Sequence, residues 1–204
     1  MQATTAPAKR MSLPIRIIVG ICGVVAIVAG ASAIRRGMAE MRDDGMSAKA
    51  SALIDSIEVA VTSGNTRTAA MQPTFMSLLS SVDSLGVLAV HRDKQDVARR
   101  VAAQLDSTVA DLRRAASLSD SASKLVTQDA RKRFLQAKVE SYTRWADGTA
   151  INREIITMLM DESITSNGEL LPKILAAAKQ RDSLQAIGNA AQERAGEIAK
   201  EFRK

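Results

Sequence analysis

The sequence predicts an all-α protein, with a single N-terminal transmembrane helix followed by an antiparallel bundle of about four to six helices. One observation is an uncharged apolar run, Ile17 to Ile34, in a chain that is 25% charged. Another is the scarcity of aromatic residues, with three Phe, one Trp and one Tyr among 204 residues. A chain poor in aromatics and rich in Ala, Leu, Gln and Arg suits closely packed helices better than sheets.

The apolar run predicts a membrane span. Eighteen residues in a helix reach about 27 Å, close to the roughly 30 Å thickness of the hydrocarbon core. Arg16 precedes the run, and Arg35 and Arg36 follow it. Their long side chains can reach the headgroups, so we expect these three arginines to act as interfacial anchors.

The same run could also be a cleaved secretory signal. It contains Ala31-Ser32-Ala33, the small-x-small pattern that signal peptidases cut, after an acid-free basic start. The basic start is long for a signal, however, and apolar residues continue to Ile34 before a charge appears. We therefore favour an uncleaved anchor, and a secreted helical protein is the alternative if residues 1–33 are removed.

Small residues recur along one side of the predicted span, while Ile and Val occupy another side. Small side chains let the backbones of two membrane helices approach closely, and such contact drives their association in lipid. We expect this small-residue face to dock on a neighbouring transmembrane helix. It comprises Gly20, Gly23, Ala26, Gly30 and Ala33.

The net charge of +6 comes from the ends of the apolar run. Five of the 28 basic residues lie in the first 36 positions, where no acid occurs, so the rest of the chain has 23 basic and 22 acidic residues. Such a balance gives no support for nucleic-acid binding, which needs a concentrated basic face. The short basic tail is costly to translocate, so we expect a cytoplasmic N-terminus and an extracytoplasmic C-terminal domain, periplasmic if the source is bacterial.

Hydrophobic periodicity beyond the span predicts a series of amphipathic helices. The clearest apolar stripe runs from Val97 through Val101, Leu105 and Leu112 to Ala115. Glycine and polar clusters mark the expected helix ends, with Pro172 in the first turn of the last helix and Ser166 before it as a cap. The expected helices are 48–63, 66–90, 93–118, 123–147, 151–164 and a last one ending near 202.

Few residues in the sequence suggest catalysis. His91 is the only histidine and is expected at an exposed turn, and the only cysteine, Cys22, lies within the apolar run. Two pairs of adjacent carboxylates, Asp43-Asp44 and Asp161-Glu162, diverge on a helix and are expected to be solvated. We therefore expect no enzyme activity, no cofactor, no metal site and no small-molecule substrate.

Two aromatic residues, Tyr142 and Trp145, lie about one turn apart in the fourth expected helix. They are a candidate contact for a partner protein or for the headgroup region. The alternative, which we favour, is ordinary packing in the bundle core.

The sequence thus divides into a basic tail (1–16), a transmembrane anchor (17–34), a juxtamembrane linker (35–46) and a helical bundle (47–204). We expect a single-pass, non-catalytic accessory or scaffold subunit of a larger membrane complex. Its partners would be membrane lipids and integral membrane protein subunits. The alternative is a sensory, ligand-binding bundle that resembles the extracytoplasmic domains of chemoreceptors in architecture only.

Overall fold

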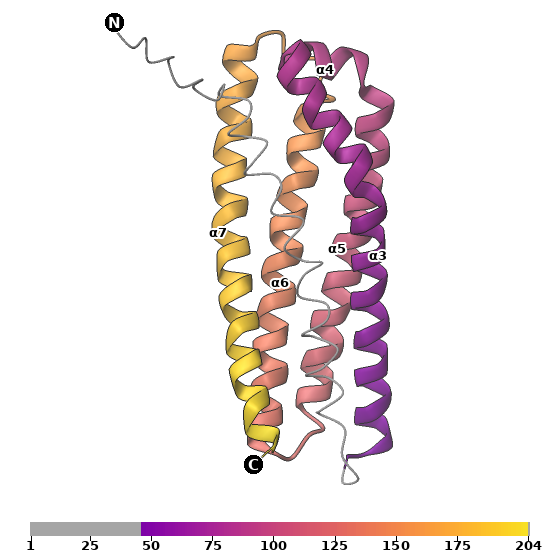
Figure 1. Cartoon of the computed structure of the whole chain (residues 1–204), viewed down its shortest axis with the longest axis vertical. Coiled ribbons are helices and arrows are strands. Elements are labelled where there is room, and N and C mark those ends of the chain that lie inside the picture. The colour runs from indigo at the N-terminus through magenta and orange to yellow at the C-terminus, as the bar shows by residue number, and fades with distance from the viewer. Residues whose placement is uncertain (1–45, 204) are drawn as a thin grey trace, which may run out of the picture.

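The computed structural model describes residues 46–203, and this part of the chain is all-helical. Four long helices lie side by side and alternate in direction, with a short fifth helix at one end of the bundle (Figure 1). The prediction of an all-α bundle of about four to six helices is confirmed for these residues, in which about five helices pack together. The elements are α3 (Ala48–Leu85), α4 (Val87–Asp93), α5 (Gln95–Ser123), α6 (Asp129–Met158), α7 (Asn167–Ala199) and the 3₁₀ turn η2 (Lys200–Arg203).

The long helices pack in chain order, α3 on α5, α5 on α6 and α6 on α7, and α4 contacts α3, α5 and α7. Their apolar stripes form two core clusters, one towards each end of the bundle. The predicted stripe on α5 is confirmed, since Val101, Leu105, Leu112 and Ala115 are all buried. Mutual burial of single apolar stripes therefore explains the bundle.

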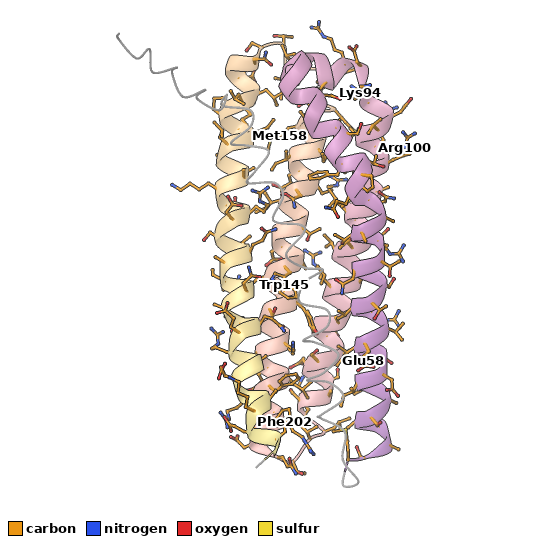
Figure 2. All side chains as sticks on the ribbon, viewed as in Figure 1. Glu58, Lys94, Arg100, Trp145, Met158 and Phe202 are labelled. Atoms are coloured by element: carbon orange, nitrogen blue, oxygen red, sulfur yellow. The ribbon has the colours of Figure 1, made fainter. Side chains whose placement is uncertain are left out.

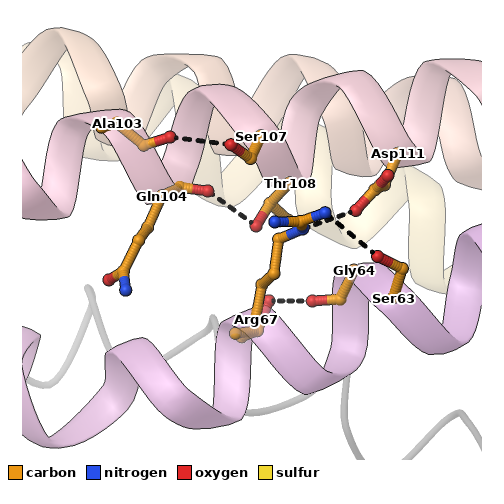
Figure 3. Close-up of polar contacts among 9 residues, drawn as sticks. Ser63, Gly64, Arg67, Ala103, Gln104, Ser107, Thr108 and Asp111 are labelled. Carbon is orange, nitrogen blue, oxygen red and sulfur yellow. Dashed lines mark hydrogen bonds and ion pairs between the residues drawn. The ribbon is translucent and has the colours of Figure 1, made fainter.

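Polar residues at the interface between α3 and α5 are satisfied locally (Figure 3). The Nε atom of Arg67 donates to the Oδ2 atom of Asp111 over 3.0 Å and joins the two helices. The buried hydroxyls of Thr68 and Thr108 each donate to a carbonyl oxygen one turn earlier in their own helix, over 2.8 and 3.0 Å. A threonine can therefore face the interior of this bundle without leaving its hydroxyl unpaired.

Two helix ends predicted at glycines are wrong. Helix α3 continues through Gly64 and Pro73, and α6 continues through Gly148. A Cβ atom at Gly64 would lie 3.6 Å from the Cβ of Asp111, and one at Gly148 would lie 3.3 Å from the Cγ of Gln185. Gly148 thus lies where α7 passes closely, and this packing offsets the cost of about 1 kcal/mol for glycine in a helix. At Gly64 a Cβ would make only an ordinary van der Waals contact, so the helix simply continues through the glycine.

The prediction at the start of α7 is partly right. The Oγ atom of Ser166 accepts a hydrogen bond from the backbone N–H of Glu169 over 3.2 Å, which confirms the N-cap. Pro172 lies in the second turn, since the helix already begins at Asn167. Proline so close to a helix start removes only one backbone hydrogen bond, so the helix tolerates it.

Residues 87–90 were expected in the second helix and His91 at a turn after it, but residues 87–93 form the separate helix α4. Gly86, with a φ of 81°, separates α3 from α4. This left-handed conformation costs glycine little, whereas a Cβ would strain it. The backbone N–H of Leu88 then donates to the Oδ1 atom of Asn167 over 3.0 Å, which holds α4 against the start of α7.

Within residues 46–203, no helix is both long enough and apolar enough to cross a membrane. The predicted span 17–34, its small-residue face and its arginine anchors lie outside the described residues.

Candidate functional site

The two aromatic residues singled out in the sequence lie in the core. Tyr142 is 0% exposed and Trp145 is 3% exposed, and their ring centroids are 6.1 Å apart. Trp145 points inward from α6 (Figure 2), and its Nε1 atom donates to the Oδ1 atom of Asn189 on α7 over 3.1 Å. Both side chains thus pack in the bundle core, which is the interpretation favoured from the sequence. Neither offers an exposed contact surface in this fold.

Trp145 fits against α7 because residue 188 is glycine. A Cβ atom built at Gly188 would lie 2.6 Å from the Cδ1 atom and 2.7 Å from the Nε1 atom of Trp145. Such distances are far below van der Waals contact, so the indole ring occupies the space that any other residue at position 188 would need. The pair Trp145–Gly188 therefore sets the spacing of α6 and α7.

A lysine is buried in the same interface. Lys138 on α6 is 1% exposed, and its Nζ atom donates to the Oε1 atom of Gln192 on α7 over 2.6 Å. The ammonium group also lies 5.2 Å from the ring centroid of Phe134 and 6.0 Å from that of Tyr142. Burial lowers the pKa of Lys138 to about 7, because the charged form loses its hydration.

The phenol of Tyr142 lies close to this lysine. Burial raises the pKa of its hydroxyl, and the negative charge of Glu58 on α3 adds to the effect. The Oη atom has no hydrogen-bond partner among the described residues. Tyr142 is therefore neutral at physiological pH and serves mainly as an apolar ring.

A second cation, Arg181 on α7, is completely buried. Its Nε atom donates to the Oδ1 atom of Asp182 over 2.9 Å, and its Nη1 atom donates to the Oδ1 atom of Asn152 on α6 over 3.3 Å. The Asp182 side chain is 54% exposed. The guanidinium is thus balanced by a carboxylate at the edge of the bundle, as a buried charge requires.

His91 is not at an exposed turn, contrary to the sequence-based expectation. It lies in α4 and is 4% exposed, and neither ring nitrogen has a hydrogen-bond partner among the described residues. The reason is that residues 87–93 form a helix which packs on the end of the bundle, so one side of that segment is covered.

The described acidic residues do not converge. Asp161 and Glu162 are both exposed, as expected. The Oδ1 atom of Asp161 accepts hydrogen bonds from the N–H and the hydroxyl of Ser163, over 3.0 and 2.6 Å, and these bonds lower the pKa of the carboxyl. Between residues 46 and 203, no group of three or more His, Cys, Asp or Glu side chains could hold a metal ion.

The most unusual titratable group in the described part is therefore Lys138. An amine whose pKa is near 7 is a nucleophile at neutral pH, but a side chain that is 1% exposed is closed to a substrate in this conformation. The contacts of Lys138 with Gln192 and the two rings join α6 to α7 inside the core.

Comparison of the chain with models of known protein families, with curated proteins and with solved structures finds no match. Any functional conclusion must therefore come from the residues of this chain alone.

Sequence reasoning missed the burial of Lys138 and Arg181, although the pattern contained a signal for it. Lys138 lies four residues after Phe134 and four before Tyr142, and Arg181 lies four after Ala177. Both therefore fall on the apolar stripe of their helix. A charged side chain at such a position predicts either a buried charge with a polar partner or a helix whose stripe faces the core in one part and solvent in another.

Proposed function

We propose that this chain is a non-catalytic, single-pass accessory or scaffold subunit of a larger membrane complex. Its N-terminal helix docks in the bilayer, and its helical bundle contacts the exposed part of the same complex outside the cytoplasm. The observation that carries the proposal is the apolar run Ile17–Ile34, which is bracketed by Arg16 and Arg35-Arg36.

The bundle supports a scaffolding role. Its most perturbed titratable groups, Lys138 and Tyr142, lie in the core, where they affect packing and meet no substrate. The four long helices have 29 to 38 residues, and each residue adds about 1.5 Å, so the helices are about 43–57 Å long and form a rod. A rod of this length suits a subunit that spans the exposed surface of a partner.

The small-residue face of the span provides the test. Replacing Gly23 and Gly30 together by leucine puts two bulky side chains where a neighbouring helix would approach. Each 1.4 kcal/mol of lost packing reduces association about tenfold. After mild solubilisation of native membranes, we expect this variant to migrate alone on native gels, whereas the wild-type chain co-migrates with other subunits.

The matched control replaces Val25 and Val28, on the bulky side of the same span, by leucine. This control should assemble normally and should remain in the membrane fraction. Unchanged co-migration of the Gly23→Leu/Gly30→Leu variant, or a wild-type chain that migrates alone, would refute the docking face.

A further inference from the structure

An asparagine followed by a glycine begins α7. Asn167 is the first residue of this helix and Gly168 is the second, and both are exposed. A backbone nitrogen that follows an asparagine can attack the Cγ atom of its side chain, and a glycine nitrogen is the least hindered. The other asparagines of the chain precede threonine, arginine and alanine, and they are Asn65, Asn152 and Asn189.

The backbone nitrogen of Gly168 is free to act as the nucleophile. A Cβ atom built at Gly168 would meet nothing within 4 Å. In the part of the chain that the structure describes, the N–H of Gly168 donates no hydrogen bond, whereas the N–H groups of Glu169 and Leu170 donate to the carbonyl oxygen of Ser166 over 3.2 Å. The first N–H groups of a helix lack an acceptor within it, and helix ends fray. The main chain at this point can therefore rotate so that the nitrogen meets the side chain.

The side chain of Asn167 is prepared for this attack by its contact with α4. Its Oδ1 atom accepts a hydrogen bond from the backbone N–H of Leu88 over 3.0 Å. Its Nδ2 atom lies beside Gly86, where a Cβ atom would be 3.8 Å away. Attack on Cγ places negative charge on Oδ1, and a backbone N–H directed at that atom stabilises the charge.

From these observations we infer that Asn167-Gly168 is a self-modifying site, where Asn167 converts to aspartate or isoaspartate and thereby changes the attachment of α4 to α7. The Gly168 nitrogen gives its proton to hydroxide and bonds to Cγ, and the Cγ–Nδ2 bond breaks. Nδ2 leaves as ammonia with a proton from water, so a five-membered succinimide remains. Water then breaks one of the two bonds between the Gly168 nitrogen and a carbonyl carbon. One water is consumed and one ammonia is released, without oxidation or reduction.

The two products differ in how they hold α4. Aspartate keeps a side-chain oxygen as the acceptor for Leu88, and its negative charge suits the start of a helix. In isoaspartate the main chain runs through Cγ, which adds one carbon between residues 167 and 168. The acceptor of Leu88 then belongs to the main chain, and the Oγ atom of Ser166 is displaced from the N–H of Glu169, which it caps over 3.2 Å.

We therefore expect the isoaspartate form to release α4. Figure 1 shows α4 and the start of α7 at the same end of the bundle. Release would uncover Val90 and His91, which are 1% and 4% exposed in the intact chain. This inference does not depend on the proposed membrane anchor.

The first test measures conversion in the full chain, kept in mild detergent at alkaline pH. Trypsin releases residues 154–173, with Asn167 as the sole asparagine, and residues 182–194, with Asn189 as the sole asparagine. Conversion adds about 1 Da to the peptide. Asn189 is the matched control, because its Oδ1 atom also accepts a hydrogen bond, from Trp145 over 3.1 Å, but the next N–H is bonded inside α7.

We expect residues 154–173 to gain this mass at least about tenfold faster than residues 182–194. The rate should rise about tenfold for each pH unit, because hydroxide removes the proton from the nucleophile. The variant G168A should fold, since its Cβ meets nothing, and should convert at least about tenfold more slowly than the wild type. Equal conversion at Asn167 and Asn189, or conversion of G168A at the wild-type rate, would overturn the site.

The second test measures the release of α4 by hydrogen exchange. Amides of residues 88–91 should exchange about tenfold faster in the isoaspartate fraction of aged chain than in fresh wild type. Fresh N167D, which carries the aspartate product, should exchange like the wild type. Unchanged exchange in the isoaspartate fraction would overturn the effect on α4. Equally fast exchange in N167D would show that the charge releases α4 and would reject the lengthened main chain as the cause.

Discussion

Replacing Gly188 by alanine is expected to destabilise the bundle by about 2–4 kcal/mol. The new Cβ atom would lie 2.6 Å from the Cδ1 atom of Trp145, and an indole ring enclosed between α6 and α7 has little room to move away. Overpacking of this kind forces helices apart or side chains out of their rotamers. Urea unfolding followed by Trp145 fluorescence measures the change in the free energy of unfolding directly.

The matched control is Gly196→Ala in the same helix. A Cβ atom at Gly196 would meet nothing within 4 Å, so the variant gains only helix propensity, and we expect it to be more stable than the wild type by up to about 1 kcal/mol. If G188A unfolds at the same urea concentration as G196A, the result contradicts the tight contact between Trp145 and α7 at position 188.

Replacing Lys138 by methionine is expected to stabilise the bundle by about 2 kcal/mol at pH 7. The pKa of this amine falls from an ordinary value of 10.5 to about 7 because of burial, which corresponds to a cost of at most about 5 kcal/mol. The variant no longer carries this cost. Part of the resulting gain in stability is lost, because the Oε1 atom of Gln192 then lacks its donor. A methionine of similar length fills the space next to the rings of Phe134 and Tyr142.

The pH dependence of this effect has a definite sign. The unfolded chain binds the Lys138 proton more tightly than the folded chain does, so the wild type gains stability as the pH rises from about 7 to about 10.5. The advantage of K138M should therefore shrink by about 1 kcal/mol per pH unit and vanish near pH 9. Urea titrations of both chains at several pH values measure the difference.

Lys132→Met is the control for the lysine, because Lys132 is exposed on the same helix. It should change stability by less than about 0.5 kcal/mol at every pH. Two results would show that Lys138 is solvated in the folded chain. One is a K138M variant that is less stable than the wild type at pH 7, and the other is a difference in the free energy of unfolding between the two chains that does not vary with pH.

Much of the bundle could be predicted from the sequence, because the apolar stripes repeat with the helical period. The stripe on α5 and the cap at Ser166 depend only on local spacing, and both are confirmed. The predicted end at Gly148 failed because glycine has two uses. It ends helices by adopting a left-handed conformation, and it lets two helices approach closely; only the tertiary contact decides between them.

The burial of charged residues was harder to predict. A lysine or arginine on an apolar stripe is usually exposed, since its long side chain can reach solvent. Lys138 and Arg181 are covered because α6 and α7 lie close together, a consequence of Gly188 and Gly148 across the interface. His91 was misplaced for a similar reason, since α4 is covered only by its contacts with the neighbouring helices.

We expect the first 36 residues to remain in the native chain and to hold it in the bilayer. The intact mass of the protein isolated from alkaline-washed native membranes tests this most directly. We expect a chain of about 21.8 kDa, the mass of all 204 residues, in the membrane fraction. A shorter chain that begins at Ile34 and is recovered in the wash would contradict it.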